Sequence, residues 1–196
     1  MKAEGMETHM NPRDALREEH GQIMKILLVL QRLLTRLVNL EAEEAKDLEA
    51  LIEFLEIYVD RCHHEKEEQI LFPALSRTRS AEIDTLIRSL IEDHRQARMN
   101  MEQMKSDAET LRSRTGADRE AFRERAERYV ELVRAHIRKE NSALLPLIEE
   151  SLSEPDRLQM AERFHELEKA TLGSSRLETL LAVVRELSRK YSLEKV

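Results

Sequence analysis

Residues 62–73 read Cys-His-His-Glu-Lys-Glu-Glu-Gln-Ile-Leu-Phe-Pro, and they end a long run of apolar residues with helical spacing. His63 and Glu67 are four residues apart, which places both side chains on one face of a helix, one turn apart. Imidazole and carboxylate groups are common ligands of transition metals. The stretch therefore predicts a helix that presents a pair of metal ligands.

The same layout recurs further along the chain. Counting from His63, a glutamate follows at four residues, a leucine at eight and a proline at ten, and the same residue types follow His136 at the same distances. One further histidine precedes each copy by about 42 residues, namely His20 and His94. A repeat of ligand-type residues predicts one shared site rather than unrelated histidines.

The composition predicts an all-helical protein. The 196 residues include only 4 Gly and 4 Pro, aromatic residues make up 4% and charged residues 36%. Such a chain favours helices and is long enough for a sizeable core. The net charge of −7 comes from interspersed acids and bases, which argues against a nucleic-acid binder.

No stretch has the length and apolarity of a membrane span, and the N-terminus lacks the apolar core of a signal peptide. Cys62 is a single cysteine, so the chain contains no internal disulfide. We therefore expect a cytoplasmic protein that does not bind a membrane.

Apolar residues with steps of three and four predict four long helices, at about 12–39, 41–75, 80–114 and 118–150. Asn11-Pro12 is a helix start, and Pro73 should kink or end the second helix. Residues 152–196 should form a short helix, a turn at 173–175 and a last helix. We expect one domain, 1–196, with an up-down-up-down left-handed four-helix bundle at about 12–151 and a C-terminal helical extension.

Each predicted bundle helix carries a histidine on its apolar stripe, and two of these histidines are followed by a glutamate on the same stripe. Buried carboxylates are costly unless they are paired or bind a metal, and burial alone should raise their pKa values. A metal-free network of histidine and glutamate remains the alternative. The predicted metal ligands are His20, His63, Glu67, His94, His136 and Glu140.

His64 and Glu68 have the same spacing as His63 and Glu67, so the helix register must be decided. The stripe of His64 contains Asp60 and Arg61, whereas Val59 and Ile70 flank the other pair. We therefore expect His63 to face inward and His64 to contribute little. The remaining histidines should lie in a leader (position 9) and on the surface (position 165).

These motifs resemble the hemerythrin-like, or HHE cation-binding, family over roughly residues 12–151. The resemblance is carried by Leu16-Arg-Glu-Glu-His20, His63-His-Glu-Lys-Glu67, Glu92-Asp-His94 and His136-Ile-Arg-Lys-Glu140. It implies a four-helix bundle with two iron ions, bridged by Glu67, Glu140 and an oxo or hydroxo group, with zinc or manganese able to replace iron. Hemerythrin proper has more histidines, and a four-histidine, two-glutamate set is similar to that of di-iron proteins that repair iron centres.

The resemblance implies a protein that senses, stores or detoxifies O2, NO or peroxide. Two other functions use the same six ligands. One is a di-iron peroxidase or an activity like that of an NO reductase, and the other is an iron donor for the repair of iron-sulfur or di-iron centres. The sequence does not decide whether the protein is an enzyme.

Overall fold

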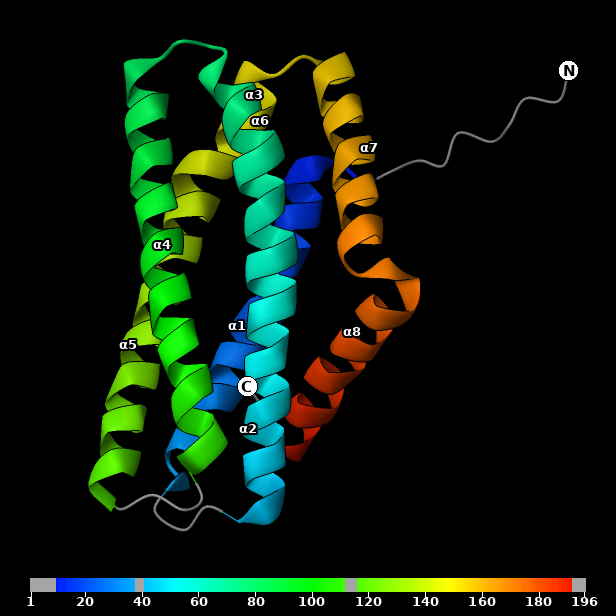
Figure 1. The fold of residues 1–196 in the computed structure, drawn as a ribbon. Helices are drawn as coiled ribbons and strands as arrows, with labels where there is room; N and C mark the ends of the chain where they lie inside the picture. Colours follow the sequence, from blue (N-terminus) through cyan, green and yellow to red (C-terminus); the bar gives the residue numbers. More distant parts are fainter. Residues whose placement is uncertain (1–9, 38–40, 112–115, 192–196) are drawn as a thin grey trace, which may run out of the picture.

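The computed structural model describes residues 10–37, 41–111 and 116–191. Within these ranges four long helical stretches run side by side in alternating directions, and no residue is in a strand (Figure 1). The prediction of an all-α bundle with alternating helix directions is confirmed. None of the helices in the described ranges is both long enough and apolar enough to cross a membrane.

The long stretches are composed of several helical segments. The first is α1 (Pro12–Leu34), and the third is α4 (Ala81–Thr110). The second stretch joins α2 (Ala42–Phe54), the π-helices η2 (Leu55–His64) and η3 (Glu67–Leu71), and α3 (Phe72–Ser76). The fourth joins α5 (Gly116–Lys139), the π-helix η5 (Glu140–Leu144) and α6 (Leu145–Ser151).

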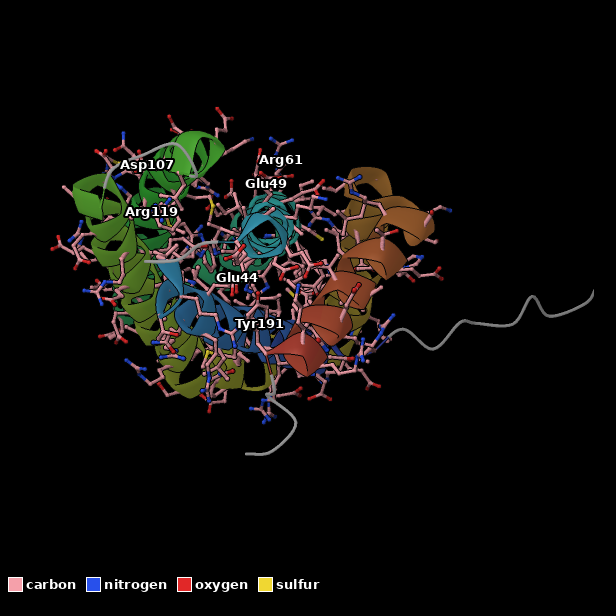
Figure 2. All side chains as sticks on the ribbon, turned by 90° about the horizontal axis from the view of Figure 1, so that it is seen from below. Glu44, Glu49, Arg61, Asp107, Arg119 and Tyr191 are labelled. Carbon is pink, nitrogen blue, oxygen red and sulfur yellow. The ribbon has the colours of Figure 1, made fainter. Side chains whose placement is uncertain are left out.

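The C-terminal extension consists of α7 (Glu154–Thr171) and α8 (Gly173–Lys190). Both helices lie along one flank of the bundle, where they contact α1 and the second stretch (Figures 1 and 2). Leu180, Val184 and Leu187 of α8 are buried in the bundle's own apolar core. The extension therefore covers part of the bundle.

Capping residues set the helix starts. The Asn11 side chain accepts a hydrogen bond from the backbone N–H of Arg13 at 2.9 Å, and Pro12 occupies the first helical position, as predicted. The Ser80 hydroxyl accepts from the backbone N–H of Ile83 at 3.4 Å and caps α4 in the same way. These caps fix where α1 and α4 begin, and so fix the height of their histidines in the bundle.

The prolines near the ends of the second and fourth stretches are accommodated by wide turns. The N–H of Phe72 bonds to the carbonyl of Glu67, and the N–H of Leu145 bonds to that of Glu140, five residues back in both cases. The residues that follow, Pro73 and Pro146, lack an N–H and would clash with a carbonyl four residues back in a regular α-helix. The wider π-turn relieves this clash, so each proline follows a π-turn that begins at a glutamate.

A polar layer crosses the bundle between two apolar clusters. One cluster includes Ile23, Cys62, Ala97 and Val133, and the other includes Leu16, Ile70, Leu90 and Leu144. On every long stretch the predicted ligands lie between a residue of one cluster and a residue of the other. The bundle therefore seals its polar residues between two apolar layers.

Candidate metal centre

All six predicted ligands lie in this polar layer and are almost inaccessible to solvent. Their exposed fractions range from 0% for Glu67, His94 and Glu140 to 3% for His136. The histidines come from the four long stretches, one on each, because each stretch presents its apolar stripe to the same interior. The structure thus brings the six predicted residues together.

The donor atoms form two overlapping groups of four. One group contains His20 and His63, the other contains His94 and His136, and Glu67 and Glu140 belong to both groups. Within each group the donor atoms lie within 4.8 Å of one another. The two glutamates thus lie between two positions that could each hold a metal ion.

A seventh residue, His64, also lies in the polar layer. It is 2% exposed, its donor atom groups with those of His94 and His136, and its ring stacks on that of His94 with centroids 3.9 Å apart. The expectation that His64 lies away from the interior is wrong. Because a π-helix turns less per residue than an α-helix, His63 and His64 at the end of η2 both remain on the inner face.

Asp60 and Arg61, the charged residues on the stripe of His64, lie at the edge of the core and do not prevent His64 from facing the interior. Arg98 of α4 donates to Asp60 at 2.5 Å, so the Asp60 charge is neutralised by a neighbouring helix. Arg61 is exposed and labelled in Figure 2. One sequence feature could have identified His64: two adjacent histidines, His63 and His64, precede Glu67 on the same helical stretch.

The other histidines and the cysteine lie outside this cluster. His165 of α7 is exposed, as expected, and position 9 falls outside the described residues. Cys62 is buried on the side of the apolar cluster, and burial raises the pKa of its thiol to about 12. It is therefore a small hydrophobic residue of the core.

Each of the four histidines predicted from the sequence has an oxygen partner on the outer side of its ring. Where that partner is a carboxylate, the Nδ1 atom must be the protonated nitrogen, which leaves the Nε2 lone pair directed to the interior. Sequence reasoning did not identify these partners. They are Glu19 for His63 (2.7 Å), Glu68 for His94 (2.7 Å), Asp93 for His136 (3.4 Å) and Asn141 for His20 (3.0 Å).

A cation lies behind each of the three carboxylates. These cations keep the carboxylates ionised and hold them in place. Each imidazole ring is therefore oriented by a carboxylate, which is itself held by a lysine or an arginine. The contacts are Lys66 to Glu19 (2.6 Å), Arg98 to Glu68 (2.8 Å) and Lys139 to Asp93 (2.6 Å).

The His94 and His136 rings meet in a way that fits a cation. Their Nε2 atoms are 3.0 Å apart, while both Nδ1 atoms face carboxylates and hold the ring protons. Two neutral rings in this arrangement direct lone pairs at each other, which is unfavourable unless a proton or a metal ion lies between them. The pair therefore fits two ligands of one metal ion.

The buried glutamates fit the same interpretation. Both carboxylate oxygens of Glu67 and Glu140, and the Nε2 atoms of His20 and His63, lack a hydrogen bond of good geometry. Imidazole nitrogens nevertheless lie close to the carboxylates: His136 Nε2 is 2.9 Å and His20 Nε2 3.1 Å from Glu140, and His94 Nε2 is 3.3 Å from Glu67. Buried polar atoms are nearly always satisfied, and buried carboxylates especially so. Metal cations would satisfy all of these atoms at once.

The protein groups also perturb one another's protonation. Burial would raise the pKa of Glu140, but the facing His136 and His20 outweigh it and hold that pKa well below its usual range. The expectation that burial raises this pKa is therefore wrong. Burial lowers the pKa of His136, yet Glu140 and Asp93 outweigh it and raise the value to about 10.

Burial and the neighbouring rings of His94 and His63 hold the pKa of His64 well below normal, so His64 is neutral.

Comparison with known proteins agrees with this geometry. The profile of the hemerythrin HHE cation-binding domain matches residues 11–148. The chain is 20% identical over 183 residues to the uncharacterized protein Rv1995 of Mycobacterium tuberculosis (strain ATCC 25618 / H37Rv), covering 93% of this chain and 70% of the relative. The uncharacterized protein Mb2018 of Mycobacterium bovis (strain ATCC BAA-935 / AF2122/97) has the same identity and coverage. The chain belongs to the hemerythrin HHE cation-binding family.

Proposed function

We propose that this protein holds a non-haem di-iron centre that binds or reacts with O2, NO or peroxide, in sensing, storage or detoxification. The observation that carries the proposal is the pair of donor groups that share Glu67 and Glu140. Two carboxylates between two sets of imidazoles suit two adjoining iron ions, and zinc or manganese could replace them.

The histidines divide unequally between the two positions. His94 and His136 face one position, where His64 adjoins them in a group of three without the glutamates, whereas His20 and His63 face the other. With both glutamates shared, the second position has fewer protein donors and leaves more room for a small exogenous ligand. Bound iron would supply one-electron redox chemistry and affinity for diatomic ligands.

The chain itself supplies the shelter and the orientation of this centre. The two apolar clusters exclude water from both sides of the polar layer, and Phe72 lies over His94 with ring centroids 5.9 Å apart. The outer carboxylates hold the imidazoles in one tautomer. Such deep burial of every ligand favours a retained metal, and so favours a resident centre over the donation of iron to another protein.

Metal analysis with a visible spectrum tests this proposal. Protein from iron-supplemented cells should hold about two iron ions per chain, and the anaerobically reduced form should change its spectrum on mixing with O2, NO or peroxide. Glu67→Gln should lower the metal content, because it removes a charge shared by both positions, whereas His165→Ala should leave it unchanged. One tightly bound zinc with no second metal would refute the di-iron centre.

A further inference from the structure

Lys66 is a buried lysine on the second stretch, between η2 and η3. It is 3% exposed, and a buried ammonium group is costly unless it is paired. Its Nζ donates to Glu19 Oε1 at 2.6 Å and to Glu168 Oε2 at 2.7 Å. Glu19 belongs to α1, but Glu168 belongs to α7 of the C-terminal extension, so one buried cation joins the extension to the bundle.

The same contacts continue to the candidate centre. The second oxygen of Glu19 accepts from His63 Nδ1 at 2.7 Å, and His63 Nε2 lies 3.9 Å from Glu67 Oε1. Each Glu19 oxygen therefore has one partner, which fixes the carboxylate plane and, through it, the His63 ring. An unbroken series of contacts runs from Glu168 through Lys66 and Glu19 to His63.

The histidines of the other donor group are held differently. The carboxylates behind His94 and His136 are bound by Arg98 of α4 and Lys139 of α5, both within the bundle. Among the contacts of the described residues with these imidazoles and their carboxylates, the series that starts at His63 is the one that reaches the C-terminal extension, at Glu168 of α7. A change in the position of α7 would therefore act on one donor group more than on the other.

The packing around Lys66 makes this contact important for α7. A pocket of about 270 Å³ separates α7 from the bundle there, with Ala15, Tyr58, Phe164 and Glu168 among its lining residues. The Phe164 ring lies 5.9 Å from Lys66 Nζ. α7 packs on the bundle through the buried Met160 and Phe164, and beside this pocket the Lys66 ammonium joins Glu168 of α7 to Glu19 of α1.

We propose that Lys66 and Glu168 are positioning residues through which α7 sets the orientation of His63. They thereby set the affinity of the metal position formed by His20, His63, Glu67 and Glu140. This inference rests on the proposed function. Linkage requires the converse effect, so a metal bound at this position must stabilise the docking of α7 by the same free energy.

The test uses the full chain and Co2+, whose visible absorption reports its ligand geometry. Relative to wild type, Glu168→Gln should weaken one of the two Co2+ sites severalfold, and Lys66→Met should weaken it about tenfold, with the other site unchanged. The double variant should bind like Lys66→Met alone, because both residues act through one series of contacts. Co2+ should also slow hydrogen exchange of the α7 amides in wild type, and less so in Glu168→Gln.

Asp47→Asn provides a matched control. Asp47 of α2 accepts hydrogen bonds from Lys190 and Tyr191 at the C-terminal end of the extension, both at 2.6 Å; Tyr191 is labelled in Figure 2. Asp47 is 16 residues before His63, or roughly 20–25 Å along the helix. The control loosens the extension without touching the series of contacts, so both Co2+ affinities should stay at wild-type values.

The outcomes separate the two proposals. If wild type binds two Co2+ ions but Glu168→Gln matches wild type in both affinity and exchange, the inference is overturned and the proposed function stands. If Asp47→Asn lowers the same affinity as strongly as Glu168→Gln, general loosening explains the effect and the inference is again overturned. A wild type that binds fewer than two Co2+ ions overturns both. Should Lys66→Met fail to fold, the partly exposed Glu168→Gln decides the matter.

Discussion

The imidazole of His64 stacks on that of His94, with ring centroids 3.9 Å apart and 18° between the ring planes. His64 also lies edge-on to His136, with centroids 5.8 Å apart. The donor atom of this neutral, buried imidazole groups with those of His94 and His136, so His64 is a candidate third histidine at that position. The π-helical register at the end of η2 therefore places His64 against the two histidines of one donor group.

His64→Ala should lower the iron content from about two ions per chain towards one, because it removes a donor from one group and leaves the other intact. His165→Ala is the control, since His165 is exposed on α7. Metal analysis of the two purified variants measures the difference. Equal iron content in both variants would show that His64 only packs against His94.

Arg98 should matter more than its neighbour Arg95. Arg98 is held between Asp60 and Glu68, the second of which accepts from the His94 ring, whereas Arg95 is exposed and pairs with Glu92 of the same helix. Arg98→Gln should lower metal affinity about tenfold and stability by about 1–3 kcal/mol. Arg95→Gln should change stability by less than about 0.5 kcal/mol. Metal titration and thermal unfolding of both variants test this, and equal effects would contradict it.

The sequence predicted all six residues of the two donor groups from the helical stripes and from the repeated His-x-x-x-Glu spacing, although His63, Glu67 and Glu140 lie in π-helices. His20 and His94 lie on regular α-helices, where steps of three and four show directly which side chains face the core. His64 lies in a π-helix, where the α period no longer applies, so its inward position could not be read from spacing. Glu19 and Asp93 adjoin ligands in the sequence but bond to rings on other helices, and such pairs depend on how the helices pack.

Asn141 distinguishes His20 from the three histidines that have a carboxylate partner. An amide oxygen polarises the Nδ1–H bond less than a carboxylate does and so leaves the ring less electron-rich. His20 should therefore donate less electron density to a metal ion than the other three histidines. Asn141→Asp should therefore stabilise the more highly charged metal ion and lower the reduction potential of the centre. Ser142→Asp adds the same charge at the exposed neighbouring position and should shift the potential much less. Spectroelectrochemical titration compares them, and equal shifts would indicate that only net charge matters.

Removal of the metal should destabilise the bundle, and more so at high pH. In the metal-free protein the pKa of His136 is raised to about 10, above about 6.5 in an unfolded chain. A raised folded-state pKa contributes stability that is fully present below about pH 6.5 and lost as the pH rises towards 10. The proton on His136 thus partly replaces a metal ion at low pH.

In the loaded protein the ligands hold metal ions instead of protons, so this loss of stability with pH should be absent. The melting temperatures of loaded and chelator-stripped protein should then differ least near pH 6 and most near pH 9. The comparison uses one buffer series and the same protein concentration. His136→Gln lacks the titrating group, so its stripped form should show a smaller change between these pH values than stripped wild type. A difference that shrinks as the pH rises would contradict this prediction, because it would mean that the stripped folded protein binds fewer protons than the unfolded chain.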